Sequence, residues 1–257
     1  MSFPQVNTRS RKGQSFGKWL AQHWLGVFLV VYGIWVWLPF MAPVFMNFGW
    51  SGAGKGLYFI YSFFCHQLPE RSIFLFGDKA MYPLNEIQAA WQNTLNPMAL
   101  RKFIGNESMG WKVAWSDRMI SFYTSVWFFA LIWPWLRAKV KPLPLWAFVL
   151  SMLPIALDGG SHMISDLAGI GQGFRDSNLW LAGLTNNALP ILFYTGDALG
   201  SFNSWMRILT GILAGFGSVW FTLPLIFRAN DLSRELQQLN YGEVLEQIKS
   251  QNPRPSG

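Results

Sequence analysis

Three groups of polar side chains stand beside apolar segments and contain residue types that could support chemistry. The first is the run Cys65-His66-Gln67-Leu68-Pro69-Glu70-Arg71-Ser72, which places a thiol, an imidazole, an amide, a carboxylate and a guanidinium within eight residues. The second group lies at the entrance to a long apolar stretch and consists of Lys112, Ser116, Asp117 and Arg118. The third lies where another apolar stretch ends and consists of Asp158, Gly159, Gly160, Ser161 and His162. Because such side chains are costly at a membrane boundary unless they find partners, the three groups predict a polar cluster.

Two arrangements of this cluster follow from its side chains. His66 and His162 could ligate a transition metal together with Asp158, since imidazole and carboxylate groups are common ligands of such ions. Alternatively, Asp158 could form an ion pair with Arg71 or Arg118, which is the simpler arrangement. The sequence leaves both open.

Cys65 is the single cysteine of the chain, so no internal disulfide can form. As a nucleophile it would need a correctly placed base such as His66, and otherwise it is a small buried apolar residue. The chain has no phosphate-binding glycine loop, no HExxH and no nucleophile elbow. The sequence therefore assigns no catalytic residue and leaves a metal ion or haem unassigned.

The composition is that of a membrane protein. Apolar residues make up 51% and charged residues only 13% of the 257 residues, whereas soluble domains carry about 25% charged residues. The net charge is +7, but the basic residues lie beside apolar runs and form no stripe interleaved with exposed aromatics. We therefore expect a lipid bilayer as partner and no nucleic acid.

Four apolar stretches are long enough to cross a hydrocarbon core as helices, which takes roughly 20 residues. They run over approximately 19–45, 119–137, 143–160 and 205–227. The fold class expected is an all-α polytopic membrane protein with about four transmembrane helices.

The distribution of Lys and Arg predicts the orientation, since short basic segments stay in the cytoplasm. Basic residues precede the first stretch, fill the short connection after the second, and follow the last. We expect both termini inside, in the plasma membrane of a prokaryote, with a cytoplasmic segment 1–18, a membrane domain 19–227 and a cytoplasmic amphipathic tail 228–257. The outer loops are then about 46–118 and 161–204, and all three polar groups reach one outer boundary.

Shorter patterns give three further expectations. The apolar run 57–64 is too short to cross alone and is interpreted as interfacial or re-entrant. In the tail, Asp231 is expected to cap an amphipathic helix and Gly242 to break it. The spacing of Gly211 and Gly215 predicts a close helix-packing face.

These polar groups and their order resemble a family of bacterial and archaeal predicted membrane proteins, domain of unknown function 2085. The resemblance covers roughly residues 57–227, and the residues that carry it are Cys65-His66-Gln67, Pro69 through Ser72, Gly110 through Ala114 with Arg118, Pro154 through Gly160, and Arg207 with Thr210 and Gly211. Ser116 stands where members commonly have a second cysteine, so the resemblance implies no cysteine pair here. The family has no assigned activity, and the resemblance supports the topology and the outer polar cluster.

Three functional hypotheses remain. We expect a non-enzymatic subunit, scaffold or binding component with a polar cluster at the outer membrane boundary, because no complete catalytic constellation is evident; other membrane protein subunits are its expected partners. The first alternative is a membrane enzyme or a metal- or haem-binding protein that uses His66, Asp158 and His162. The second is a small-solute transporter, suggested by the polar groups at helix ends.

Overall fold

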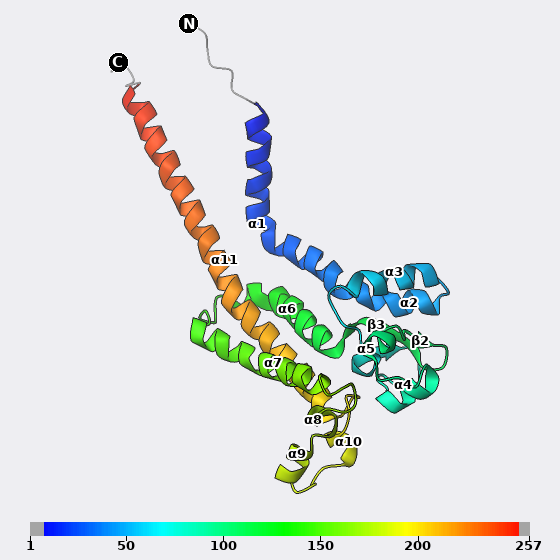
Figure 1. Ribbon diagram of the computed structural model, residues 1–257. Helices are drawn as coiled ribbons and strands as arrows, with labels where there is room; N and C mark the ends of the chain where they lie inside the picture. Colours follow the sequence, from blue (N-terminus) through cyan, green and yellow to red (C-terminus); the bar gives the residue numbers. More distant parts are fainter. Residues whose placement is uncertain (1–7, 252–257) are drawn as a thin grey trace.

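The computed structural model describes residues 8–251 and is built around four helices that are long and apolar enough to cross a membrane (Figure 1). The first crossing runs through α1, the short 3-10 helix η1 and α2, and the others are α6, α7 and α11. The bounds of these elements are Thr8–Trp37, Leu38–Phe40, Met41–Asn47, Asp117–Leu136, Leu145–Asp166 and Phe202–Gln251. The prediction of a helical protein with four candidate membrane spans is confirmed. The orientation with both termini inside stays a prediction.

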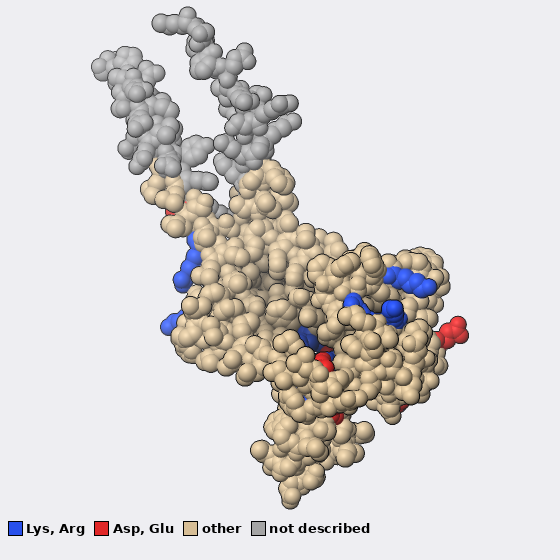
Figure 2. Space-filling model, viewed as in Figure 1, with Lys and Arg blue, Asp and Glu red and all other residues tan. Residues whose placement is uncertain are grey.

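The surface of these helices is apolar, as expected for segments that satisfy their own backbone hydrogen bonds in lipid. Large apolar side chains such as Val30, Leu150 and Leu157 are exposed on them. Figure 2 shows few charged atoms over the middle of the helices.

Glycines let α6 and α11 approach closely. A Cβ atom at Gly211 would overlap Ser121 Oγ on α6, and one at Gly215 would lie 2.6 Å from Ser125 Cβ. The predicted glycine packing face is therefore confirmed. Gly217 makes the corresponding approach to Ser151 of α7.

The segment between α2 and α6 folds into a head that contains a small antiparallel sheet. We call it the outer head, because the orientation predicted from the sequence places it outside. The order of the sheet is β1-β3-β2, with Ser72 opposite Ser116 and Gly105 opposite Trp111. The elements of the head are α3 (Ser51–Tyr61), the 3-10 helix η2 (Pro69–Arg71), β1 (Ser72–Leu75), α4 (Leu84–Ala90), α5 (Pro97–Leu100), β2 (Gly105–Asn106) and β3 (Gly110–Ser116).

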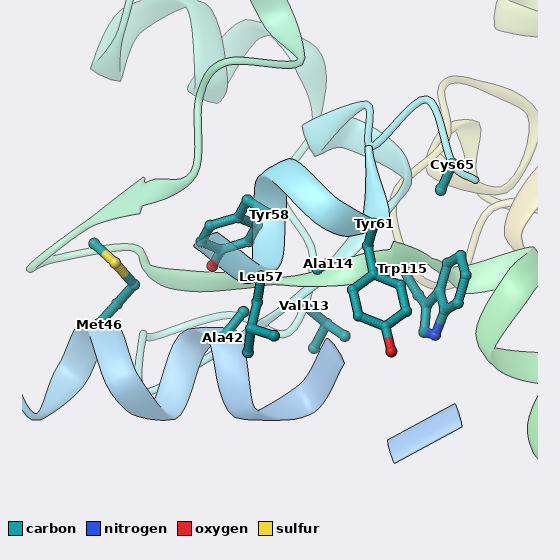
Figure 3. Packing of buried hydrophobic residues seen from close by; sticks show 9 residues of the cluster. All are labelled: Ala42, Met46, Leu57, Tyr58, Tyr61, Cys65, Val113, Ala114 and Trp115. Carbon is teal, nitrogen blue, oxygen red and sulfur yellow. The ribbon is translucent and has the colours of Figure 1, made fainter. Parts of the chain in front are cut away.

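The sequence analysis did not predict the sheet, because nearly every residue of β3 is buried and its apolar pattern does not alternate. Trp115 and Val113 of β3 pack against Tyr58 and Tyr61 of α3 and against α2 (Figure 3). The predicted interfacial run 57–64 covers the end of α3, so part of it belongs to this core.

A second segment, on the same side of the spans as the head, joins α7 to α11. It holds three short helices, α8 (Phe174–Ser177), α9 (Leu179–Leu184) and α10 (Ile191–Tyr194). In Figure 1 they project from the end of α7 and the start of α11.

Two boundaries differ from the sequence-based expectations. α7 continues past residue 160 to Asp166, so His162 lies within the helix and not in a loop. α11 continues to Gln251, so Asp231 caps nothing and Gly242 does not break the helix; a glycine costs only about 1 kcal/mol in a helix that already propagates from the span. Residues 1–7 and 252–257 of the predicted terminal segments lie outside the described residues.

Candidate functional site

Arg71 joins the outer head to the membrane helices. Its Nη1 and Nη2 atoms each donate to a carboxylate oxygen of Asp166, at the end of α7, over 2.7 Å, and its Nε donates to Asp197 over 2.8 Å. η2 and the strand that follows it place Arg71 in a buried position. The planar guanidinium suits this geometry, since two parallel N–H groups match the two oxygens of a carboxylate.

Arg207 makes the equivalent connection from α11. Its Nε lies 2.8 Å from both oxygens of Asp117 at the start of α6, and its Nη2 donates to the Asp197 carbonyl over 2.6 Å. Arg207 Nη1 also donates to the Asp197 carboxylate. Burial opposes ionisation of Asp197, but the guanidinium groups of Arg71 and Arg207 hold its pKa well below the usual range.

Asp158 of α7 forms ion pairs with arginines of two other helices, α6 and α8. Its two oxygens accept from Arg118 Nη2 over 2.7 Å and from Arg175 Nη2, on α8, over 2.8 Å. Arg71 and Arg118 were both expected as partners of Asp158. Arg118 does pair with Asp158, whereas Arg71 pairs with Asp166 and Asp197.

His162 lies between these pairs. Its Nε2 is 3.3 Å from Asp197 Oδ1 and its Nδ1 is 3.1 Å from the Asp158 carbonyl oxygen. Asp158, His162 and Asp166 are spaced four residues apart, so they share one face of α7.

These contacts form one network, which we call the outer polar cluster after the side on which the predicted orientation places it. It contains four guanidinium groups, four carboxylates and one imidazole, and each carboxylate accepts from at least one guanidinium. Its members are Arg71, Arg118, Arg175, Arg207, Asp117, Asp158, Asp166, Asp197 and His162. The formal charges of its ion pairs cancel.

Sequence reasoning missed four members as site residues. Arg207 lies inside the predicted span 205–227, where a charge signals a required partner. Asp166 could have been found by continuing the four-residue spacing of Asp158 and His162. Arg175 and Asp197 fall in a segment predicted as an outer loop, where a charged residue carries no such signal.

The Cys65-His66-Gln67 run belongs to the head, next to the cluster. Gln67 adopts φ +52°, its N–H lies 3.4 Å from Cys65 Sγ, its side chain donates to the Tyr58 carbonyl over 3.0 Å, and its carbonyl accepts from Lys112 Nζ over 2.7 Å. Cys65 is buried at the edge of the aromatic core (Figure 3), while His66 alone is exposed. The run therefore anchors the head through Gln67 and Lys112, and Cys65 is not presented as a surface nucleophile.

Glu70 and Lys112 are buried titratable groups of the head. Neither carboxylate oxygen of Glu70 has a hydrogen-bond partner among the described residues, and burial raises the pKa of Glu70 to about 7. Burial lowers the pKa of Lys112 to about 7, although its Nζ donates to the carbonyl oxygens of Gln67 and Arg101. A carboxyl group without partners favours the protonated form.

The candidate metal ligands are not brought together as a ligand set. Within the part of the chain that the structure describes, no three His, Cys, Asp or Glu side chains could jointly hold a metal ion. Both oxygens of Asp158 are occupied by guanidinium groups, and His66 lies in the head. The donor set does not fit a transition metal, because two positive guanidinium groups already neutralise its carboxylate.

A known protein family matches the part of the chain that contains most residues of this cluster. The family model of predicted membrane proteins called domain of unknown function 2085 matches residues 107–221 of the chain. This confirms the resemblance over a narrower range than the sequence analysis gave. The matched range includes β3, α6, α7 and the start of α11, and so it contains Asp117, Asp158 and Arg207; it begins after Arg71.

One relative is an uncharacterized protein, MJ1492, of the archaeon Methanocaldococcus jannaschii. It is 25% identical over 196 residues, which cover 73% of this chain and 83% of the relative. No solved structure matches the chain significantly.

Proposed function

We propose that the protein is a non-enzymatic component of a prokaryotic plasma membrane that binds another membrane protein subunit at its outer face. One observation carries this proposal: each carboxylate of the outer polar cluster is paired with a guanidinium group from a different element. Carboxylates neutralised in this way are poor bases, nucleophiles or metal ligands. The cluster is better suited to hold segments in place.

Complete pairing is what a structural role requires. Burying one ion costs several kcal/mol unless its partner and further hydrogen bonds compensate it. Here the compensating groups come from the head, from α6, α7 and α11, and from α8, so the cluster can be neutral only when these parts are assembled. Its formation therefore fixes the outer segments on the spans.

The segment fixed in this way exposes a large apolar surface, which we call the apolar projection (residues 179–194, α9 and α10). Leu184 is 80% exposed, Leu192 76% and Ile191 75%. Apolar side chains gathered on a projecting element are typical of an interaction surface. The Tyr194 hydroxyl, which accepts from Leu189 N–H over 3.0 Å and lies 2.6 Å from Thr185 Oγ1, holds the two helices together.

Two asparagines connect the apolar projection to the cluster. Asn178 Nδ2 donates to the carbonyl oxygens of Arg175 and Tyr194 over 2.6 and 2.7 Å. Asn203 of α11 accepts from Arg175 Nε over 3.1 Å and donates to the Gly196 carbonyl over 2.9 Å. Pairing in the cluster is thereby coupled to the position of the projection, which supports a binding role.

Photo-crosslinking in native membranes tests this function. Replacing Leu184 by the photoreactive residue benzoylphenylalanine should give one protein adduct of defined mass, and adding Asn203→Ala should abolish it by releasing the projection. The matched control is the same replacement at Leu150, an exposed apolar residue of α7 that should react with lipid only.

Lipid adducts alone at Leu184 would overturn the proposal. A stoichiometric metal ion or a haem absorption spectrum in the purified protein would instead favour an enzyme or cofactor protein.

A further inference from the structure

A second site candidate lies at the opposite end of the spans from the outer polar cluster. A cavity of about 600 Å³ opens there between the middle of α1, the connection from α6 to α7, and α11. The residues that matter for its chemistry are Gln22, Trp24, Trp133, Arg137, Arg228 and Asp231. Since α6 begins at Asp117 in the cluster, Arg137 at its other end marks the far boundary of the membrane domain.

The walls of this cavity are held by contacts of their own. Leu143 N–H donates to the Trp220 carbonyl over 3.3 Å, which ties the connection to α11. Trp24 packs on Phe227 at 5.1 Å between ring centroids, and Trp133 packs edge-on against Trp220 at the same distance. The cavity is therefore bounded by ordered elements and has an aromatic wall.

The charged groups of the cavity favour an anion. The Arg137 guanidinium lies 4.9 Å from the centroid of the Phe227 ring, which keeps it on the cavity wall. Among the side chains that the structure describes, neither Arg137 nor Arg228 forms an ion pair with a carboxylate. Asp231 is the acidic residue in the lining, so the cavity carries one net positive charge.

We propose that this cavity binds the phosphodiester headgroup of an anionic phospholipid. The two guanidinium groups would bind the phosphate oxygens, for which arginine is well suited. One net positive charge matches the single negative charge of a phosphodiester, and the Gln22 amide and Asp231 carboxylate can bind the hydroxyl groups of a glycerol headgroup. The aromatic wall provides a surface for the upper part of an acyl chain, as aromatic side chains do at membrane boundaries.

The position of the cavity favours a lipid over a free phosphate ester. It lies where the spans end and where basic side chains gather beside the connection from α6 to α7 (Figure 2). A soluble anion would gain nothing from the aromatic wall, whereas a lipid can place its headgroup and its chain on the two kinds of surface at once.

The test uses the full chain, purified in detergent and stripped of lipid, with phosphatidylglycerol as the probe. Native mass spectrometry should detect bound phosphatidylglycerol in preference to phosphatidylcholine, and phosphatidylglycerol should raise Tm. In Arg137→Gln/Arg228→Gln the affinity for phosphatidylglycerol should fall at least about tenfold. The matched control is Lys139→Gln/Lys141→Gln, which removes the same charge from the same end of the bundle without changing a lining residue and should keep the affinity.

The proposal would be overturned if the arginine and lysine variants lost affinity for phosphatidylglycerol equally, or if the arginine variant kept its affinity. An equal Tm shift with glycerol phosphate would also overturn it, because the ligand would then be a soluble phosphate ester. If the arginine variant does not fold, Asp231→Asn provides the second test. Removing that carboxylate should strengthen binding of phosphatidic acid, which lacks the glycerol hydroxyls, relative to phosphatidylglycerol. An unchanged ratio between these two lipids would contradict the assigned role of Asp231.

Discussion

The two outer nitrogens of the Arg71 guanidinium each donate to one carboxylate oxygen of Asp166, which joins the outer head to the end of α7 across 95 positions of sequence. The side chain of Arg71 is 6% exposed and that of Asp166 is 24% exposed. Arg71→Met should therefore leave Asp166 without its partner and weaken the hold on Asp197. We expect it to lower the free energy of unfolding by about 3–5 kcal/mol, as breaking a buried ion pair does, measured by denaturant titration in detergent.

The control for this prediction is an exposed ion pair of the same length in the same head. Lys79 Nζ and Glu86 Oε1 also lie 2.7 Å apart, but their side chains are 53% and 38% exposed. Lys79→Met should change the free energy of unfolding by no more than about 1 kcal/mol, because water solvates the remaining charge. Similar losses in the two variants would contradict a special role for the cluster.

Glu70 predicts a pH dependence of stability. Its pKa is about 7 in the folded protein, against an ordinary value of 4.5, because it is buried. Between these values the folded state keeps a proton that the unfolded state loses, so stability is fully present below about pH 4.5 and falls as the pH rises toward 7. Glu70→Gln, which is neutral at every pH, should have little effect at pH 5 and should raise stability by up to about 3 kcal/mol at pH 7.5.

The measurement is the Tm of both proteins from pH 5 to 7.5. Lys112 changes stability in the opposite direction, since its lowered pKa makes stability rise with pH between about 7 and its ordinary value of 10.5. Keeping the titration at or below pH 7.5 limits that contribution. The control is Glu86→Gln on α4, where the side chain is 38% exposed. A Tm difference for Glu70→Gln that stays constant with pH would refute the assignment.

Local hydrophobicity made the spans predictable from sequence. A helix in lipid satisfies its own backbone groups, so four apolar stretches could be assigned without knowing what packs on them. The common outer location expected for the three polar groups follows from the same rule, and Arg118 and Asp158 are indeed paired. Gly211 and Gly215 were recognisable for a similar reason, since their spacing places them on one helix face.

Pairing across the fold was not predictable in the same way. Arg71 had no sequence signal that selects Asp166 and Asp197 over Asp158, because the choice depends on where the head docks. Asp197 could not be distinguished from any other loop carboxylate until Arg71 and Arg207 were placed around it. β3 was missed because its buried residues lack the alternation that identifies a half-exposed strand.

Gly217 predicts a test of the packing between α11 and α7. A Cβ atom there would overlap Ser151 Oγ and lie 2.7 Å from Ser151 Cβ. Gly217→Ala should lower the free energy of unfolding by about 1–3 kcal/mol through overpacking. Adding Ser151→Gly should recover much of this loss, because the next nearest atom is the flexible Met152 Cε at 3.3 Å.

The control for this pair is Gly160→Ala in α7, where nothing lies within 4 Å of the added Cβ atom. That variant should be neutral or slightly stabilising, because alanine favours helix over glycine by about 1 kcal/mol. If the effects of Gly217→Ala and Ser151→Gly simply add, the two residues are not in contact.

The orientation of the chain can be tested with engineered cysteines, because Cys65 is the single native thiol. Cys65 is only 5% exposed, so it should react slowly in the folded protein from either side of the membrane and is a poor reporter itself. In a Cys65→Ala background we would compare Met98→Cys on α5 of the head with Leu239→Cys near the end of α11, both at exposed positions. An impermeant maleimide should label the first variant and not the second in intact cells, and both after lysis. The reverse pattern would place the head and the outer polar cluster on the cytoplasmic side and the basic segments outside, contrary to the orientation that their positive charges predict.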